Sequence, residues 1–211
     1  MAPMIIKGGV CLDDCKEIPD EYKEYITIGD NVIIMTGTVL AANGFGFVRD
    51  DDGVLHHRPH EFGVTIGDGV WIGNNCTIDR GRWRDTAVGG GTKIDNAAHI
   101  AHNAVIGKHC LIHANTNLCG SVNIGDFTEI YPFSNISPGV TIGSRCTIAS
   151  NSFVNKDVPD GETWGGVPAR RITPRASLIR KETKIEIKVQ DKVEKKGGGG
   201  VSESRYKKQA D

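Results

Sequence analysis

The segment 94-IDNAAHIAHNAVIGKHCLIHANTNLCG-120 decides the fold, because an aliphatic residue returns in it at every sixth position. The same spacing continues on both sides and fills twelve consecutive positions: Val88, Ile94, Ile100, Ile106, Ile112, Leu118, Ile124, Ile130, Ile136, Ile142, Ile148 and Val154. A second set of small or β-branched residues follows at a spacing of four: Thr92, Ala98, Ala104, Cys110, Thr116, Val122, Thr128, Ser134, Val140, Cys146 and Ser152. A helix repeats about every 3.6 residues and a strand every two, so neither explains this period.

A period of six fits a coil with flat faces and tight corners, in which each hexapeptide points one large aliphatic side chain inward. The sequence therefore predicts an all-β protein, a left-handed parallel β-helix with a short C-terminal extension. Three hexapeptides make one coil of this architecture. Residues eighteen apart should then lie one above the other, on coils about 4.8 Å apart.

The same register begins earlier, at Ile28, and is interrupted by two insertions. We expect an N-terminal segment, a β-helix with two inserted loops, an exit with an extension, and a flexible tail, in the order 1–27, 28–157 (loops 41–65 and 79–87), 158–196 and 197–211. The charged stretch 173–196 fits either a helix or a strand. Loops are the means by which uniform coils differ from one another, so we expect recognition to lie in the insertions.

The composition argues against several classes of protein. The formal net charge is −1, although residues 170–211 hold thirteen Lys and Arg against six Asp and Glu. We therefore expect no nucleic-acid partner. No stretch resembles a signal peptide or a membrane span. The six cysteines show no zinc-type pairs and no evident disulfide framework, which favours a reduced, cytoplasmic protein.

Four short motifs, in order, carry a family resemblance: 43-NGFGF-47, 76-CTIDRG-81, 94-IDN-96 and 100-IAHNAVIG-107. Over residues 26–155 the chain resembles the UDP-3-O-acylglucosamine N-acyltransferases of lipid A synthesis, which belong to the hexapeptide-repeat acyltransferases. It is also similar to the nucleotide-sugar N-acetyltransferases. In both groups the histidine that matches His102 is the catalytic base. The resemblance also implies a homotrimer with active sites between subunits.

The residues themselves fit that role. His102 falls two positions after an inward aliphatic residue, at a predicted corner, and a neutral imidazole can accept a proton from an attacking amine. Gly120 lies eighteen residues later and should sit above His102, where the families resembled use a glycine N–H as oxyanion donor. Asn96 lies one hexapeptide before His102, and the resemblance implies that it positions substrate together with Phe45 and Phe47. The alternative is that His102 is a solvated corner residue and Asn96 a turn asparagine.

The other histidines suggest weaker roles. His113 should stack over Asp95 and orient substrate, or it is a satisfied surface contact. His99 is expected to pack at an edge or subunit contact. The cluster 56-HHRPH-60 is interpreted as a loop that touches substrate, because it lacks a partner at metal-ligand spacing. The histidine spacing also disfavours the γ-class carbonic anhydrases, which share this fold, so we expect no metal.

The exit 164-WGGVPARRI-172 resembles the terminal element that holds coenzyme A in many hexapeptide acetyltransferases. The resemblance implies acetyl-CoA binding by Gly166, Val167, Pro168, Ala169, Arg170 and Arg171, and guanidinium groups suit phosphate. A plain chain turn is the alternative. The lipid A family would instead take a long acyl chain from an acidic acyl carrier protein.

Two departures from the lipid A family favour a trimmed enzyme that acetylates a nucleotide-linked amino sugar. The residues before Ile28 are too few for that family's uridine-binding domain, and Gly139 stands where its second histidine would align. The sequence thus predicts an N-acyltransferase, with an O-acetyltransferase or a non-catalytic β-helix scaffold as alternatives.

Overall fold

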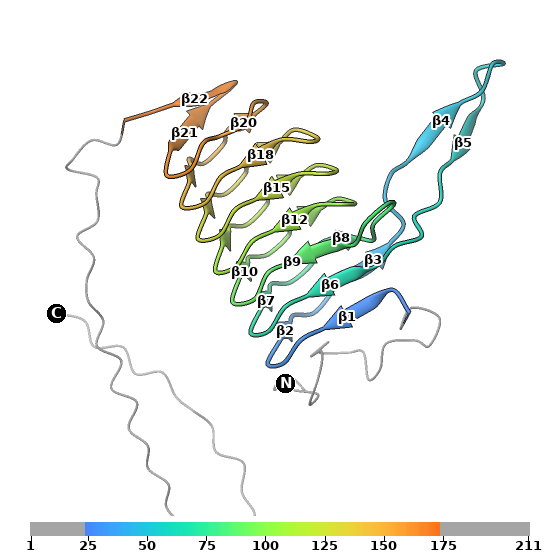
Figure 1. The fold of residues 1–211 in the computed structure, drawn as a ribbon, viewed down its shortest axis with the longest axis horizontal. Helices are drawn as coiled ribbons and strands as arrows, with labels where there is room; N and C mark the ends of the chain where they lie inside the picture. Colours follow the sequence, from blue (N-terminus) through green and yellow to red (C-terminus); the bar gives the residue numbers. More distant parts are fainter. Residues whose placement is uncertain (1–23, 174–211) are drawn as a thin grey trace, which may run out of the picture. The chain divides into compact units, whose positions relative to one another are not determined.

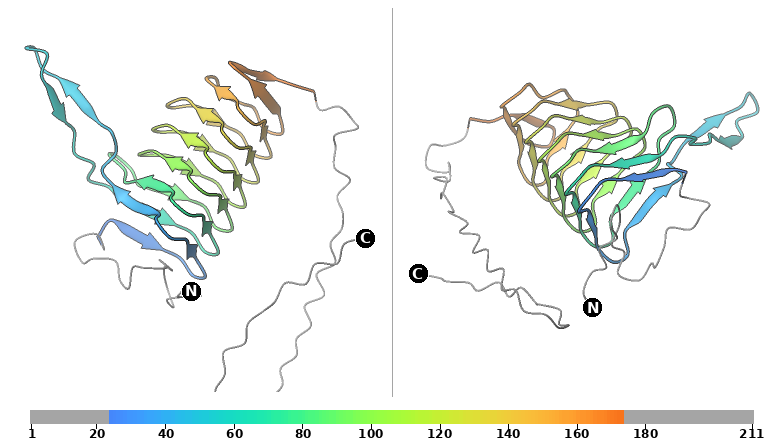
Figure 2. Two further views of the ribbon diagram at one scale, coloured as in Figure 1. Left: turned by 180° about the vertical axis from the view of Figure 1, so that it is seen from behind. Right: turned by 60° about the horizontal axis from the view of Figure 1, so that its bottom comes forward.

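The computed structural model describes residues 24–173, and these residues form strands and no helix. They build the left-handed parallel β-helix that the hexapeptide repeat predicts, with three sheets as the faces of a prism (Figures 1 and 2). The predicted tail and nearly all of the stretch 173–196, with its choice between helix and strand, lie outside the described residues. No helix in this part of the chain is long and apolar enough to cross a membrane.

Each sheet collects every third strand of the β-helix, and all pairs between coils are parallel. The first sheet contains β1 (Ile26–Ile28), β6 (Val64–Ile66), β9 (Thr86–Val88), β12 (Val105–Ile106), β15 (Asn123–Ile124) and β18 (Thr141–Ile142). The second contains β2 (Ile33–Ile34), β7 (Trp71–Ile72), β10 (Lys93–Ile94), β13 (Leu111–Ile112), β16 (Glu129–Ile130), β19 (Thr147–Ile148), β21 (Thr163–Gly166) and β22 (Ala169–Arg171). The third contains β3 (Val39–Ala42), β8 (Thr77–Asp79), β11 (His99–Ile100), β14 (Asn117–Leu118), β17 (Asn135–Ile136) and β20 (Phe153–Val154).

The register confirms three hexapeptides per coil. Lys93 pairs with Leu111 and His99 pairs with Asn117, which are offsets of eighteen residues. All twelve aliphatic residues of the main repeat are buried, and so are the eleven small residues that follow at a spacing of four. The prism therefore has the continuous apolar interior that the sequence predicts.

Some of the small inward residues also form hydrogen bonds with the backbone of the corners. Thr92 donates from Oγ1 to the carbonyl of Gly107 (2.8 Å) and accepts the N–H of Cys110 (3.0 Å). Burial raises the pKa of the Cys110 thiol, as it does for the thiols of Cys76 and Cys146. The reactive form of cysteine is the thiolate, and a raised pKa keeps these three side chains as thiols. We therefore interpret them as packing residues.

The first insertion is a β-hairpin that projects from the coils, made of β4 (Phe47–Arg49) and β5 (Leu55–His57) (Figure 1). Its turn is built by Asp50, whose Oδ1 accepts the N–H groups of Asp52 (3.1 Å) and Val54 (2.8 Å). Oδ2 of Asp50 lies 2.6 Å from Nε2 of His56, and this contact holds the pKa of the Asp50 carboxyl below its usual value. The second insertion joins β8 to β9. Since β3 and β8 are parallel neighbours, both insertions leave the third sheet at the carboxyl ends of its strands.

Candidate active site

His102 lies at the corner after β11, where the chain turns from the third sheet to the first. Its Nδ1 is 2.8 Å from Oδ1 of Asn103. Asn103 is buried and has a left-handed φ of 63°, which asparagine tolerates better than most residues. Its N–H donates to Oγ1 of Thr86 (2.8 Å), and its Nδ2 donates to the carbonyl of Arg84 (3.0 Å).

These bonds determine which nitrogen of His102 carries the proton. Since the amide nitrogen of Asn103 is committed to Arg84, the group that faces the imidazole is the acceptor Oδ1. The hydrogen of the neutral ring therefore sits on Nδ1, and Nε2 keeps a free lone pair. This is the tautomer that a general base needs.

Gly120 covers the imidazole on the next coil, as the eighteen-residue register predicts. A Cβ built on Gly120 would lie 2.8 Å from Cε1 and 2.9 Å from Nε2 of His102. The N–H of the following residue, Ser121, donates to the carbonyl of His102 (2.9 Å). Within residues 24–173 the N–H of Gly120 donates no hydrogen bond, which leaves it available to a ligand beside Nε2.

The first insertion closes the other side of the ring. A Cβ on Gly44 would lie 2.9 Å from Cβ and from Cδ2 of His102, and 2.8 Å from Nε2 of His60. The rings of His60 and His102 have centroids 4.9 Å apart. The imidazole of His102 is thus held between two backbone segments and has little room to move.

His60 is the one described residue with buried side-chain nitrogens that lack a hydrogen-bond partner, and this holds for both Nδ1 and Nε2. Burial, followed by the neighbouring His102 and His57, lowers the pKa of His60 from its ordinary 6.5 to about 4. The ring is therefore neutral near pH 7. Its buried ring lies beside that of His102.

Two pockets open beside His102. The hairpin pocket, of about 420 Å³, is lined by His102 with Phe45, Gly46, Phe47, Leu55, Arg58, His60 and Arg82. The coil pocket, of about 510 Å³, is lined by His102 with Phe45, Asp79, Trp83, His99, Ala101, Asn117, Cys119, Gly120, Ser121 and Pro138. An acceptor and a donor can therefore approach the ring from different sides.

The structure brings Phe45 and Phe47 to His102, but it places the other two substrate candidates elsewhere in the subunit. Asn96 is exposed at the corner after the second sheet, where its Oδ1 accepts the N–H of Asn74 (2.7 Å). His113 lies at that same corner, 2.9 Å from Oε1 of Glu129 and stacked on Tyr131. One hexapeptide is a third of a coil, so a step of six moves a residue to another corner.

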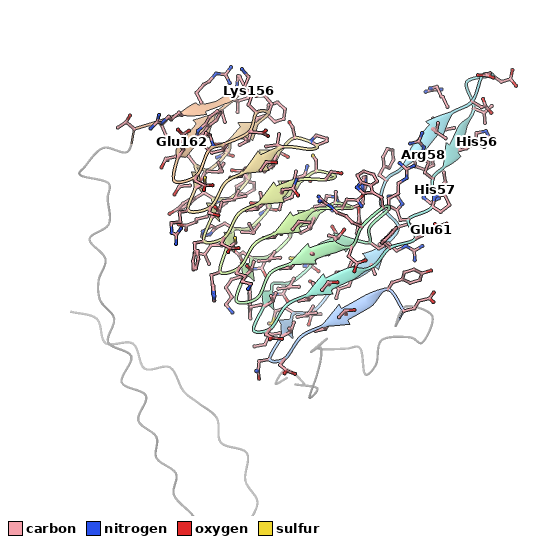
Figure 3. All side chains as sticks on the ribbon, in the orientation of Figure 1. His56, His57, Arg58, Glu61, Lys156 and Glu162 are labelled. Carbon is pink, nitrogen blue, oxygen red and sulfur yellow. The ribbon has the colours of Figure 1, made fainter. Side chains whose placement is uncertain are left out.

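The predicted donor residues form a hairpin at the last coil. Gly166, Val167, Pro168, Ala169, Arg170 and Arg171 belong to β21, β22 and the turn between them. Both arginine side chains are exposed, and Nε of Arg171 lies 3.3 Å from Oε1 of Glu162. Residues 102, 120, 138 and 156 are each eighteen apart and so share one corner. Lys156 therefore lies three coils beyond His102, or about 14 Å at a coil spacing of about 4.8 Å. Figure 3 shows Lys156 and Glu162 at this end.

The cluster 56–60 does not act as one unit. His56 contacts Asp50 and His57 lies along the hairpin (Figure 3), while Arg58 and His60 line the hairpin pocket. Residues 24–173 contain no group of three or more His, Cys, Asp and Glu placed to hold a metal ion.

Sequence reasoning missed three residues of the site, whereas it placed His60 in a loop that touches substrate. Asn103 comes from the corner after β11, and Arg84 and Trp83 come from the second insertion. Asn103 follows His102 in the sequence, and that adjacency is a usable signal for a residue that orients a base. Arg84 and Trp83 lie in a loop whose path the repeat does not determine.

Known proteins similar to this chain share its repeat. The family described as bacterial transferase hexapeptide (six repeats) matches residues 121–156, and the family described as hexapeptide repeat of succinyl-transferase matches residues 61–80. A UDP-3-O-acylglucosamine N-acyltransferase of Methylobacterium nodulans is 44% identical over 145 residues, which are 69% of this chain and 41% of that protein. A protein of Arabidopsis thaliana named "Probable UDP-3-O-acylglucosamine N-acyltransferase 2, mitochondrial" is 39% identical over 143 residues, or 68% of this chain and 47% of that protein.

Among solved structures, the UDP-N-acetylglucosamine acyltransferase of Arabidopsis is similar with a TM-score of 0.62 and 28% identity, over 72% of this chain and 51% of that one. LpxA of Bacteroides fragilis, a UDP-N-acetylglucosamine acyltransferase, has the same TM-score with 26% identity, over 70% of this chain and 56% of that one. The chain spans less than half the length of the two curated relatives above.

Proposed function

Because the chain belongs to the hexapeptide-repeat acyltransferase superfamily, we propose that it transfers an acyl group from a thioester to the amine of a UDP-linked glucosamine. The acceptor follows from the relatives, both of which are named as N-acyltransferases of a UDP-3-O-acylglucosamine. Their names say acyl and not acetyl, so acetyl-CoA is one of two candidate donors and an acyl carrier protein is the other.

In the proposed reaction, Nε2 of His102 takes a proton from the acceptor amine while the amine nitrogen attacks the thioester carbonyl carbon. The carbonyl oxygen becomes an oxyanion, which the N–H of Gly120 stabilises. Collapse of the tetrahedral intermediate forms the amide and expels the thiolate, which receives the proton from His102. Asn103 stabilises the ring while it carries that proton.

The observation that carries this proposal is the stacking of Gly120 on His102. A free backbone N–H and a free imidazole nitrogen face one pocket, and Asn103 fixes the ring in the tautomer of a base. A solvated corner histidine would need neither the buried Asn103 nor the glycine above it.

The hairpin pocket favours a donor with an acyl chain longer than acetyl. Phe45, Phe47 and Leu55 offer an apolar wall beside His102, and the cavity of about 420 Å³ exceeds the volume of an acetyl group. The corner from His102 to Lys156 and the exposed Arg170 and Arg171 would then lie along the path of the phosphopantetheine arm of either donor.

We further propose that a neighbouring subunit completes the site in a homotrimer. Phe45 is 87% exposed and Trp83 is 53% exposed, although both line the coil pocket. Asn96 and His113 lie on another corner of the prism. They can contribute to the reaction only from a second subunit.

The test is acyl transfer by purified protein, with acetyl-CoA or a long-chain acyl carrier protein as donor and UDP-glucosamine or its 3-O-acyl derivative as acceptor. We expect amide formation that His102→Ala lowers at least about 1,000-fold. The control is His109→Ala, which removes a corner histidine stacked on Phe127. Equal loss in both variants, or full activity of His102→Ala, refutes the mechanism. Formation of an ester without an amide would favour the O-acyltransferase. Absence of both the reaction and donor binding would favour the non-catalytic scaffold.

A further inference from the structure

Asp79 is a buried carboxylate that faces the same pocket as His102. It ends β8, and the register places it one coil below Ala101, next to the corner that carries His102. Its side chain is 12% exposed, and it lines the coil pocket together with His102 and Gly120. Two hydrogen-bond acceptors, the carboxylate and Nε2 of His102, therefore face one cavity.

The carboxylate of Asp79 has acceptor capacity to spare. Its one ion-pair contact among the described residues is with Nε2 of His99, at 3.9 Å, which is too long for a hydrogen bond. His99 is held instead through Nδ1, which lies 2.6 Å from Oγ1 of Thr77. Burial raises the pKa of Asp79, while His99 and then His102 lower it. A carboxylate that is largely shielded from water and has no hydrogen-bond donor is stabilised by any N–H donor that enters the pocket.

We propose that Asp79 accepts an N–H of the acceptor amine and so makes the site selective for an amine over a hydroxyl. This inference rests on the proposed function and names the residue that would decide between N- and O-acylation. An amine carries at least two hydrogens, so it gives one to His102 and another to Asp79. A hydroxyl carries one hydrogen, and it leaves one of the two acceptors without a partner.

The unpaired acceptor makes this preference large. Sites built to hydrogen-bond a group reject analogues that cannot make the bond, because a buried polar atom is then left unsatisfied. Asp79 is a specificity residue in this scheme, and the proton transfer remains with His102. His99 lies beside the carboxylate in the pocket lining, and Thr77 holds the ring of His99 through Nδ1.

The experiment is equilibrium titration of the full chain with UDP-glucosamine and with UDP-glucose, which differ in the amine or hydroxyl at one carbon. Wild type should bind UDP-glucosamine at least about tenfold more tightly. Asp79→Asn should reduce the ratio, and Asp79→Leu should abolish it. Asp126→Asn is the matched control, since Asp126 accepts the N–H of Lys108 at another corner.

Two further results separate the possible readings. His99→Gln should leave the preference intact, because it keeps the carboxylate; loss of the preference in this variant would mean that Asp79 acts only through His99 and would overturn the inference. Equal binding of the two sugars by wild type, no binding of either, or an unchanged ratio in both folded Asp79 variants would also overturn it. Acyl transfer measured in parallel tests the proposed function separately. Activity with an unchanged amine preference in the Asp79 variants would refute this inference alone.

Discussion

Replacing Gly120 by alanine sets a methyl group against the ring of His102. The added Cβ would lie 2.8 Å from Cε1 and 2.9 Å from Nε2, whereas carbon atoms in contact lie about 3.5 to 4 Å apart. The ring must therefore move by roughly 0.5 to 1 Å. It has no easy direction, because Gly44 packs on its other side and Asn103 holds Nδ1.

The expected loss is catalytic more than structural. A misplacement of about 1 Å costs about 100-fold in rate, and the methyl group also covers the N–H side of the pocket. The φ of Gly120 is not left-handed, so alanine meets no backbone strain there, and overpacking should cost about 1 to 3 kcal/mol. We expect kcat/KM to fall at least about 100-fold while the protein stays folded.

Steady-state acyl transfer and urea denaturation, measured on the same preparations, test this prediction. Gly90→Ala is the control: it changes a corner glycine of the same repeat, where the nearest atom to the new Cβ would be the carbonyl oxygen of Asp68 at 3.2 Å. If Gly120→Ala keeps kcat/KM within about threefold of wild type, the reasoning that places the oxyanion and the base beneath Gly120 is wrong.

Two further predictions concern groups that contact the base. Asn103→Asp places a carboxylate beside the ring and stabilises its protonated form, so the acidic limb of the pH profile of kcat/KM should move to higher pH; an unmoved limb would contradict the role given to Asn103. The pKa of His60, about 4, lies below its ordinary 6.5, so the unfolded chain binds this proton more tightly. Stability should therefore fall by up to about 3 kcal/mol as pH drops from 6.5 to 4, and His60→Asn should remove that part of the slope in urea titrations; equal slopes in both proteins would show that His60 titrates normally.

The interior and the register of this protein were predictable because each hexapeptide must bury one aliphatic side chain. That requirement repeats along the chain and leaves a period of six that no helix or isolated strand produces. The same register located Gly120, because residues eighteen apart share a corner. Asn96 is a substrate residue only by what the family resemblance implies; it lies six residues before His102, and a step of six leads to another corner, where its Oδ1 accepts the N–H of Asn74.

The walls of the site could not be predicted from the repeat, because they are built by the two insertions that interrupt it. The hairpin brings Gly44 and His60 onto His102, and the second insertion brings Arg84 to Asn103. Their positions depend on long-range contacts, of which the local sequence carries little trace. The repeat thus supplies His102 and Gly120. The insertions enclose the pocket, and the carbonyl of Arg84 in the second insertion orients Asn103, which sets the tautomer of His102. In a scaffold whose coils are nearly identical, chemistry at one corner requires that the coil pattern be broken next to it, and both breaks in this chain meet at His102.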